Sequence, residues 1–229
     1  MPENAVSSLD ITAIALYLVA LVSYGYVSSF PSLERRSIVG AVQRQRVRWM
    51  QNMAARDVRI VDAHLLGGLS QGNAFFASTS AIIIGGLSTM LGSGDKVQVL
   101  LERLPFVVPS SAFLFEMKLL LIIAIFVASF FKFTWAFRLS HYAAIMIGAT
   151  PIYDATNQDR CAAHADRTAH LIGLAAEHAN SGLRGFYYAI AATAWIFHPI
   201  ALIIATIWVL LVLIRRDFFS RSRRLMTND

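Results

Sequence analysis

The chain has 229 residues, of which 56% are hydrophobic and 15% charged, and its mean hydropathy is +0.56. This composition excludes an ordinary soluble domain, and the presence of one cysteine, Cys161, excludes a scaffold held together by disulfides. The formal net charge of +6 comes from basic residues that lie next to apolar segments. We therefore expect anionic membrane lipid, and not nucleic acid, as the partner of these charges.

Four segments of the chain are apolar over the roughly 20 residues that a helix needs to cross a bilayer. They cover residues 8–30, 69–91, 112–137 and 185–214. They predict an all-α integral membrane protein with four transmembrane helices in a single membrane domain, residues 1–229. The chain has no basic region before the first segment, which is also long for a signal core, so we expect that helix to be retained.

The connections between these spans carry two further helical patterns, at about residues 43–66 and 154–181. The first is either a basic amphipathic helix on the membrane surface or a solvated helical extension of the second span. More Lys and Arg lie in the connections after the first span and before the fourth than on the other side, although the arginine-rich tail, residues 215–224, opposes this assignment. By the positive-inside rule, we expect a bacterial inner (plasma) membrane protein with basic cytoplasmic connections and both termini outside.

Small residues recur every three or four positions along the second span, which places them on one stripe of a helix. Such a stripe allows close helix–helix approach, either within the helical bundle or, alternatively, at an oligomer contact or a pore. The residues of this stripe are Ser70, Ala74, Ala77, Ala81, Gly85, Ser88 and Gly92.

Polar residues within the predicted spans are candidates for function because burying them in lipid is costly. Lys132 either snorkels to the interface or lines a permeation pathway. His198 is either a proton, ligand or metal contact, or a neutral side chain bonded to a carbonyl that Pro199 leaves free. Gln71 and Asn73 add hydrogen-bonding capacity at one end of the second span. We expect no cofactor, and haem is disfavoured because no other span contains a histidine in its apolar core.

The segment 154–181 contains the one cluster of enzyme-like residues in the sequence. Asp166, His170 and Glu177 are spaced so that they share one helical face, and they are weak candidates for a divalent metal site. The sequence contains no Gly-rich phosphate loop, no nucleophile elbow and no HExxH motif. An enzymatic function is therefore not favoured.

Several short motifs resemble those of the uncharacterised membrane-protein family catalogued as domain of unknown function 599. The resemblance extends from about Arg35 to Leu213 and implies a multi-span helical membrane protein, but no known activity. The similar segments are Arg59-Ile60-Val61-Asp62-Ala63, Phe75-Phe76-Ala77-Ser78-Thr79, Gly85-Gly86-Leu87, Phe131-Lys132-Phe133-Thr134-Trp135, Ile147-Gly148-Ala149-Thr150-Pro151, and Trp195-Ile196-Phe197 with Pro199.

Three functions are compatible with these observations. The first is a non-enzymatic membrane scaffold or accessory subunit, associated with copies of itself or with other membrane proteins. The second is an oligomeric channel or transporter for an ion or small solute. The third is a membrane metalloprotein that uses the cytoplasmic histidine and carboxylates.

Overall fold

The computed structural model describes residues 7–28, 30, 33, 36–154 and 156–227. All regular secondary structure in these residues is α-helical. The helices are α1 (Ser8–Ser28), α3 (Ile38–Ala54), α4 (Ile60–Gly92), α5 (Gly94–Leu101), α6 (Ala112–Gly148), α7 (Gln158–Phe197), α8 (Pro199–Phe218) and α9 (Arg221–Thr227).

Four regions of the described chain are helical, long and apolar enough to cross a membrane: α1, α4, α6 and the segment Pro199–Thr227 that contains α8. This confirms the predicted all-α fold with four membrane-spanning candidates. Three helices are much longer than a bilayer requires, since α4, α6 and α7 contain 33, 37 and 40 residues. At 1.5 Å per residue these helices measure about 50 to 60 Å, whereas the hydrocarbon core is about 30 Å thick.

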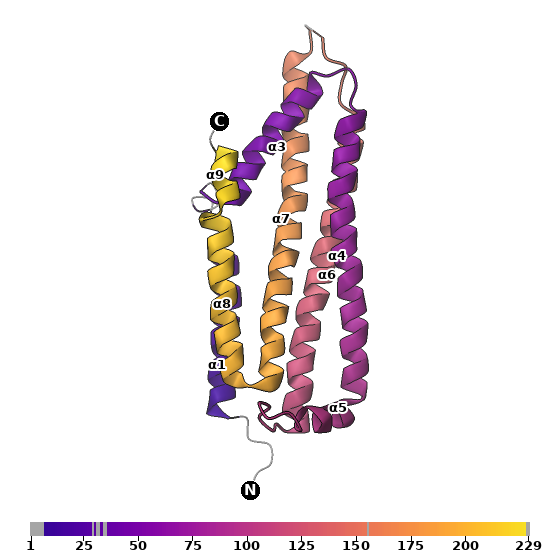
Figure 1. Ribbon diagram of the computed structural model, residues 1–229. Coiled ribbons are helices and arrows are strands. Elements are labelled where there is room, and N and C mark those ends of the chain that lie inside the picture. Colours follow the sequence, from indigo (N-terminus) through magenta and orange to yellow (C-terminus); the bar gives the residue numbers. More distant parts are fainter. Residues whose placement is uncertain (1–6, 29, 31–32, 34–35, 155, 228–229) are drawn as a thin grey trace.

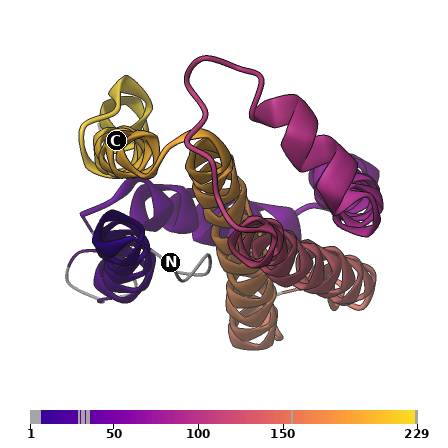
Figure 2. The same cartoon turned by 90° about the horizontal axis from the view of Figure 1, so that it is seen from below.

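The long helices pack side by side (Figure 1). In the view of Figure 2, α4, α6 and α7 follow one another across the bundle, and α8 and α1 lie beyond α7. We name the two ends of the bundle after the helices that lie there. The α5 end holds α5, and the α3 end is where α3 and α9 pack together (Figure 1).

The predicted fourth span, residues 185–214, is not one helix. Helix α7 ends at Phe197, and α8 begins at Pro199 and runs back along α7 toward the α3 end (Figure 1). His198 has extended backbone angles between them, with φ −158° and ψ 138°. Proline lacks the backbone N–H that a helix interior needs but fits its first position, so Pro199 starts α8.

This reversal also decides where the first and last described helices lie in the bundle. Because α7 and α8 form an antiparallel pair, α1 begins at the α5 end and α9 lies at the α3 end (Figure 1). These two elements therefore lie at opposite ends of the bundle, whereas the placement of both termini outside a membrane remains a prediction. The same reversal brings the arginine-rich tail to the end of the bundle that holds α3.

Two predicted helical segments also differ from the structure. The segment 43–66 is divided, because α3 ends at Ala54 and α4 begins at Ile60. The third span, expected over residues 112–137, lies within α6, which continues beyond it to Gly148. The cytoplasmic helix 154–181 has no stop at its end, and α7 runs from Gln158 through to Phe197. Asn180, Ser181 and Gly182 are helical because packing against α6 outweighs their weak helix propensity.

The buried residues form two apolar clusters along the bundle. One lies among α1, α6, α7 and α8, and includes Tyr17, Ile122 and Leu202. The other lies at the α3 end among α3, α4, α6 and α7, and includes Met50 and Ile172. The long helices are thus packed to each other both in the apolar zone and beyond it.

Candidate functional site

Helix α1 is apolar over most of its surface, but its buried face is partly polar. The buried residues recur every three or four positions and are Asp10, Ala13, Tyr17, Ala20 and Tyr24. Side chains at this spacing lie on one face of a helix. That face points toward α7 and α8, and its polar groups all find partners there.

Tyrosine hydroxyls on α1 and α7 each donate a hydrogen bond to a backbone carbonyl of the other helix. Tyr17 donates to the carbonyl of Tyr188 at 2.9 Å, and Tyr188 donates to the carbonyl of Ala20 at 3.2 Å. Farther along, Tyr24 donates to the carboxylate of Asp217 at 2.8 Å. Buried hydroxyl groups of this kind hold helices together in an apolar environment, where water offers no alternative partner.

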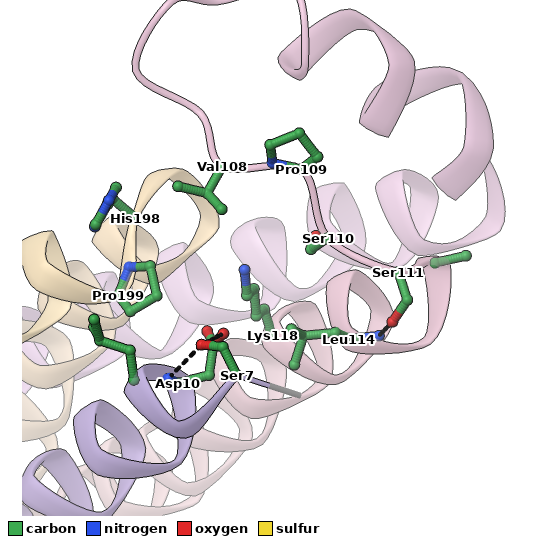
Figure 3. A pocket seen from close by; sticks show the side chains of 12 residues that line it. Ser7, Asp10, Val108, Pro109, Ser110, Ser111, Leu114, Lys118, His198 and Pro199 are labelled. Carbon is green, nitrogen blue, oxygen red and sulfur yellow. Dashed lines mark hydrogen bonds between the residues drawn. The ribbon is translucent and has the colours of Figure 1, made fainter. Parts of the chain in front are cut away.

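A cavity of about 630 Å³ lies at the α5 end, where α1, α6 and α8 begin. We call it the end cavity. Figure 3 shows Lys118, Asp10 and Ser7 on one side of it, with His198 and Pro199 on another. Its lining residues are Ser7, Leu9, Asp10, Val108, Pro109, Ser110, Ser111, Ala112, Leu114, Lys118, His198 and Pro199.

Asp10 is the buried carboxylate of this cavity, with 7% of its surface exposed. Its oxygens accept hydrogen bonds from the Ser7 hydroxyl at 2.7 Å and from the indole N–H of Trp195 at 2.8 Å. Asp10 also lies in the first turn of α1, where the positive end of the helix dipole stabilises a negative charge. The carboxylate is therefore well satisfied by its own surroundings.

Lys118 is the buried cation of the same cavity, and it is less well satisfied. The residue is only 3% exposed, and its Nζ lies 5.6 Å from the centre of the Trp195 ring. It interacts electrostatically with Asp10, but no described carboxylate lies within 4.0 Å of it and no described group accepts a hydrogen bond from it. A buried ammonium group needs such partners, so its free donors are available to a ligand.

Two helix beginnings add to the positive character of the end cavity. Ser111 caps α6, accepting a hydrogen bond from the N–H of Leu114 at 3.2 Å. His198 caps α8, its Nδ1 accepting from the N–H of Ile200 at 3.0 Å. Each helix start leaves other N–H groups without partners inside the helix and carries a partial positive charge. Together with Lys118, this arrangement suits a small anion such as a carboxylate or phosphate.

A second polar cluster lies at the α3 end, where the turn between α3 and α4 meets the connection between α6 and α7. Arg59 donates to the carbonyls of Thr150 and Pro151, at 2.7 and 2.8 Å, and to that of Ala54 at 3.3 Å. Two sequence motifs, residues 59–63 and 147–151, thus meet in space. Their contact joins the end of α3 to the end of α6.

Asp62, in the first of these motifs, is completely buried. Its carboxylate accepts hydrogen bonds from the Trp49 indole at 2.7 Å and from Arg56 at 3.0 Å. The aromatic motifs pack in a similar way, because Phe76 stacks on Phe133 with ring centres 5.1 Å apart and planes at 17°. Arg59, Asp62, Phe76 and Phe133 of these motifs thus contact neighbouring helices or connections.

The model of the family described as "Protein of unknown function, DUF599" matches residues 12–222. The chain belongs to the DUF599 family. Neither the curated proteins nor the solved structures contain a match to it. The family match agrees with the resemblance seen in the motifs. It assigns no activity to the residues of this DUF599 protein.

The small-residue stripe of α4 is divided in the DUF599 structure. Ser70 and Ala77 are buried, and Ala74 is half-buried. The remaining four residues, Ala81, Gly85, Ser88 and Gly92, are exposed, and a Cβ added at Gly85 or Gly92 would meet no atom within 4 Å. This part of the stripe faces away from the chain's own helices.

The predicted polar residues do not form one site. His198 lies at the turn between α7 and α8, lining the end cavity, and not deep within a span. Its proposed bond to a free carbonyl is replaced by the bond it accepts from Ile200. Lys132 instead donates to Ser181 on α7 at 2.7 Å. Gln71 is exposed and Asn73 half-buried on α4.

The three metal candidates are not brought together. Asp166 and His170 approach to 3.6 Å on the surface of α7. Glu177 is two turns farther on, about 10 Å along the helix axis at 1.5 Å per residue, which is too far to share one ion. The described residues contain no group of three His, Cys, Asp or Glu side chains that could hold a metal. A shared helical face is thus not sufficient for a site.

Sequence reasoning did not identify Asp10, Lys118 or the buried tyrosines as site residues. Asp10 stands near the start of an apolar segment, where it is easily taken for a residue at the interface. One signal was present, because Asp10, Tyr17 and Tyr24 are each seven residues apart and so mark one face of α1. Their partners on α7 and α8 lie more than 160 residues away in the chain.

Proposed function

We propose that this DUF599 protein is a non-enzymatic membrane protein that binds a small anion in the end cavity and serves as an accessory subunit of a membrane complex. The observation that carries the proposal is Lys118, a residue only 3% exposed whose ammonium has no hydrogen-bond acceptor among the described residues. The N-terminal ends of α6 and α8 lie beside it, and their partial positive charge also favours an anionic ligand. The described lining of the cavity offers one other charged side chain, Asp10, whose oxygens already accept hydrogen bonds from Ser7 and Trp195.

The distribution of basic residues supports an orientation with the α3 end in the cytoplasm. That end holds α3, the connection to α4, the start of α7 and the arginine-rich tail, whereas the described part of the α5 end holds Lys96, Arg103 and Lys118. Positive residues near membrane spans remain on the cytoplasmic side. In this orientation the end cavity faces the outside, α1 begins outside and α9 lies inside.

Helix α4 supports the role as a subunit. It lies at one edge of the bundle, and only 11% of its most apolar 18-residue window is buried. Its exposed face carries Ala81, Gly85, Ser88 and Gly92, which allow a second helix to approach closely. We propose this face as the contact with another membrane-protein chain or with a second copy of this one.

Anion binding is tested with the purified full chain in phosphatidylcholine nanodiscs. Chloride, phosphate, acetate and succinate are added as sodium salts at constant ionic strength, and the unfolding temperature is measured. A ligand present at 100 times its Kd stabilises the folded state by about 2.7 kcal/mol, an increase of a few degrees. We expect at least one anion to give this increase in the wild type and none to give it in Lys118→Met.

Lys96→Met is the matched control, because Lys96 is an exposed lysine on α5 at the same end of the bundle. It should respond to anions as the wild type does. The proposal fails if no anion stabilises the wild type, or if Lys118→Met is stabilised to the same degree.

The subunit role is tested by native mass spectrometry of the chain extracted from its own membrane without overexpression. We expect a complex heavier than the 25.3 kDa chain alone. Gly85→Leu should reduce this complex, whereas Gly86→Leu, which is exposed but turned by about 100° on the helix, should not. A chain that is always monomeric and without partner contradicts the subunit role and leaves anion binding untouched.

Transport of the same anion is the second candidate function. It is favoured by the polar face of α1. Along this face Asp10, Tyr17 and Tyr24 follow one another from the end cavity to Asp217 on α8. Proteoliposomes loaded with the anion that binds best should release it faster than protein-free liposomes loaded with the same anion. Tyr17→Phe should slow this release. Binding without flux would leave the accessory role and exclude transport of that anion.

A further inference from the structure

A second hollow lies between α1, α6 and α7, separate from the end cavity. It has a volume of about 490 Å³, and we call it the α1–α6–α7 groove. It is open to the surroundings, since Ala124 and Ala128 on one wall are exposed and Leu18 on another is 43% exposed. Its lining residues are Leu18, Leu21, Tyr24, Gly25, Leu121, Ala124, Ile125, Ala128, Ser129, Lys132, Glu177, His178, Ser181, Arg184, Gly185 and Tyr188.

The two ends of this groove differ in chemistry. Helices α1 and α6 run toward the α3 end and α7 runs away from it, so residue numbers give the position of each lining residue (Figure 1). The part nearer the α5 end is apolar and includes Leu18, Leu121 and Ala124. The part nearer the α3 end is polar, and its residues are Tyr24, Lys132, Glu177, His178, Ser181 and Arg184.

Two basic side chains, Lys132 and Arg184, line the polar end of the groove. Lys132 donates to the Ser181 hydroxyl at 2.7 Å, and Arg184 lies close enough for its charge to repel that of Lys132. Glu177 is the one described carboxylate in the lining, and it forms no ion pair with either cation within 4.0 Å. Two like charges near lipid are stabilised by an anion between them.

The depth of these cations matches a membrane interface. Lys132 lies roughly 20 residues along α6 from its start, which is about 30 Å at 1.5 Å per residue and equals the thickness of the hydrocarbon core. The distance from Leu121 to Lys132 along α6 is about 16 Å, close to the depth of one leaflet. The groove therefore has the length and polarity of a single phospholipid.

We propose that the α1–α6–α7 groove binds one anionic phospholipid from the leaflet at the α3 end. Its phosphate lies between Lys132 and Arg184, with the Ser181 hydroxyl beside it. An acyl chain extends along Leu121, Ala124 and Ala128 toward the α5 end. The groove shares no lining residue with the end cavity, so this inference stands independently of anion binding there.

The experiment uses the full chain in nanodiscs of phosphatidylcholine containing phosphatidylglycerol. The chain is released in the gas phase by native mass spectrometry, and the retained lipids are identified and counted. We expect the wild type to retain one phosphatidylglycerol in preference to phosphatidylcholine. The double variant Lys132→Met/Arg184→Met should lower this preference at least roughly five-fold for each charge removed. Lys132→Arg should keep it.

Two further variants distinguish the binding of a lipid from the binding of another anion and from a general loss of structure. Ala128→Phe fills the apolar part while leaving both cations in place, and it should also release the lipid. Arg138→Met removes an exposed charge from α6 outside the groove and should change nothing. Unchanged phosphatidylglycerol in the double variant overturns the proposal. So does displacement by inorganic phosphate with no effect of Ala128→Phe, because that result assigns the cations to free phosphate.

Discussion

The indole N–H of Trp195 donates a 2.8 Å hydrogen bond to the carboxylate of Asp10, which lies 185 residues earlier in the chain. Both residues are buried, and the same indole ring faces the Lys118 ammonium. Trp195 therefore connects three helices, since Asp10 lies on α1, Lys118 on α6 and Trp195 on α7. Both charges of the end cavity thus lie beside one indole, with Asp10 at its N–H and Lys118 over its ring.

Replacing Trp195 by phenylalanine tests this connection. The variant keeps most of the apolar contact but removes the hydrogen bond to Asp10, so we expect a loss of about 1–2 kcal/mol in the free energy of unfolding. The measurement is reversible chemical unfolding in detergent, followed by fluorescence. Trp208→Phe is the control, because Trp208 is 68% exposed on α8. Equal losses in both variants would contradict a special role for Trp195.

The contact of Arg59 with the connection between α6 and α7 should hold the α3–α4 turn in place. Arg59→Met removes a charged donor from three carbonyl groups, and such bonds contribute about 1.5–3 kcal/mol each at most. We expect faster hydrogen exchange in residues 50–60 and faster proteolysis at this turn, with α1 and α8 unaffected. Arg160→Met, an exposed arginine on α7, should exchange like the wild type. Unchanged exchange in Arg59→Met would show that the turn is held by other contacts.

Two glycines of the chain should respond in opposite ways to substitution by alanine. A Cβ at Gly182 would lie 2.8 Å from the Phe133 ring, which is itself buried and stacked on Phe76, so Gly182→Ala should cost about 1–3 kcal/mol. Gly67 on α4 has no atom within 4 Å of an added Cβ, and Gly67→Ala should stabilise by about 0.5–1 kcal/mol through helix propensity. Unfolding temperatures measured side by side decide this, and a stabilised Gly182→Ala would contradict the packing described between α6 and α7.

The connection before α7 contains a carboxylate with a shifted pKa. The Thr156 hydroxyl donates to Asp154 at 2.6 Å and the Thr156 N–H at 2.8 Å, and these bonds lower the pKa of Asp154 below its ordinary value. We expect Thr156→Val to raise that pKa, because it removes the hydroxyl donor. Nuclear magnetic resonance titration of the selectively labelled aspartate carboxyl measures it. An unchanged pKa in Thr156→Val would contradict the assigned cause.

The sign of the pH dependence follows from the direction of this shift. Because the folded pKa of Asp154 lies below the unfolded value of about 3.9, its contribution to stability is present above that value. It is lost as the pH falls through the folded pKa. The connection between α6 and α7 should therefore loosen in strong acid and remain unchanged between neutral and mildly acidic pH.

Much of the architecture could be predicted from local sequence. The apolar segments predicted α1, α4 and α6 as membrane-spanning candidates because hydropathy is summed over consecutive residues. The family resemblance followed from short motifs, and Arg59 and Phe133 show that these motifs encode contacts between helices. The small residues of α4 were visible for the same reason, since helical periodicity alone places Gly85 and Ser88 on one face.

The tertiary structure alone decided the direction of the last helices and the composition of the candidate sites. Hydropathy does not report chain direction, and the reversal at His198 needs no polar loop because the His198 ring caps α8 while Pro199 starts it. An apolar run of 30 residues therefore looks the same whether it is one helix or two. Hydrogen bonds between residues far apart in the chain leave no periodic signal, so the meeting of Asp10, Lys118 and Trp195 became visible only once the helices were packed.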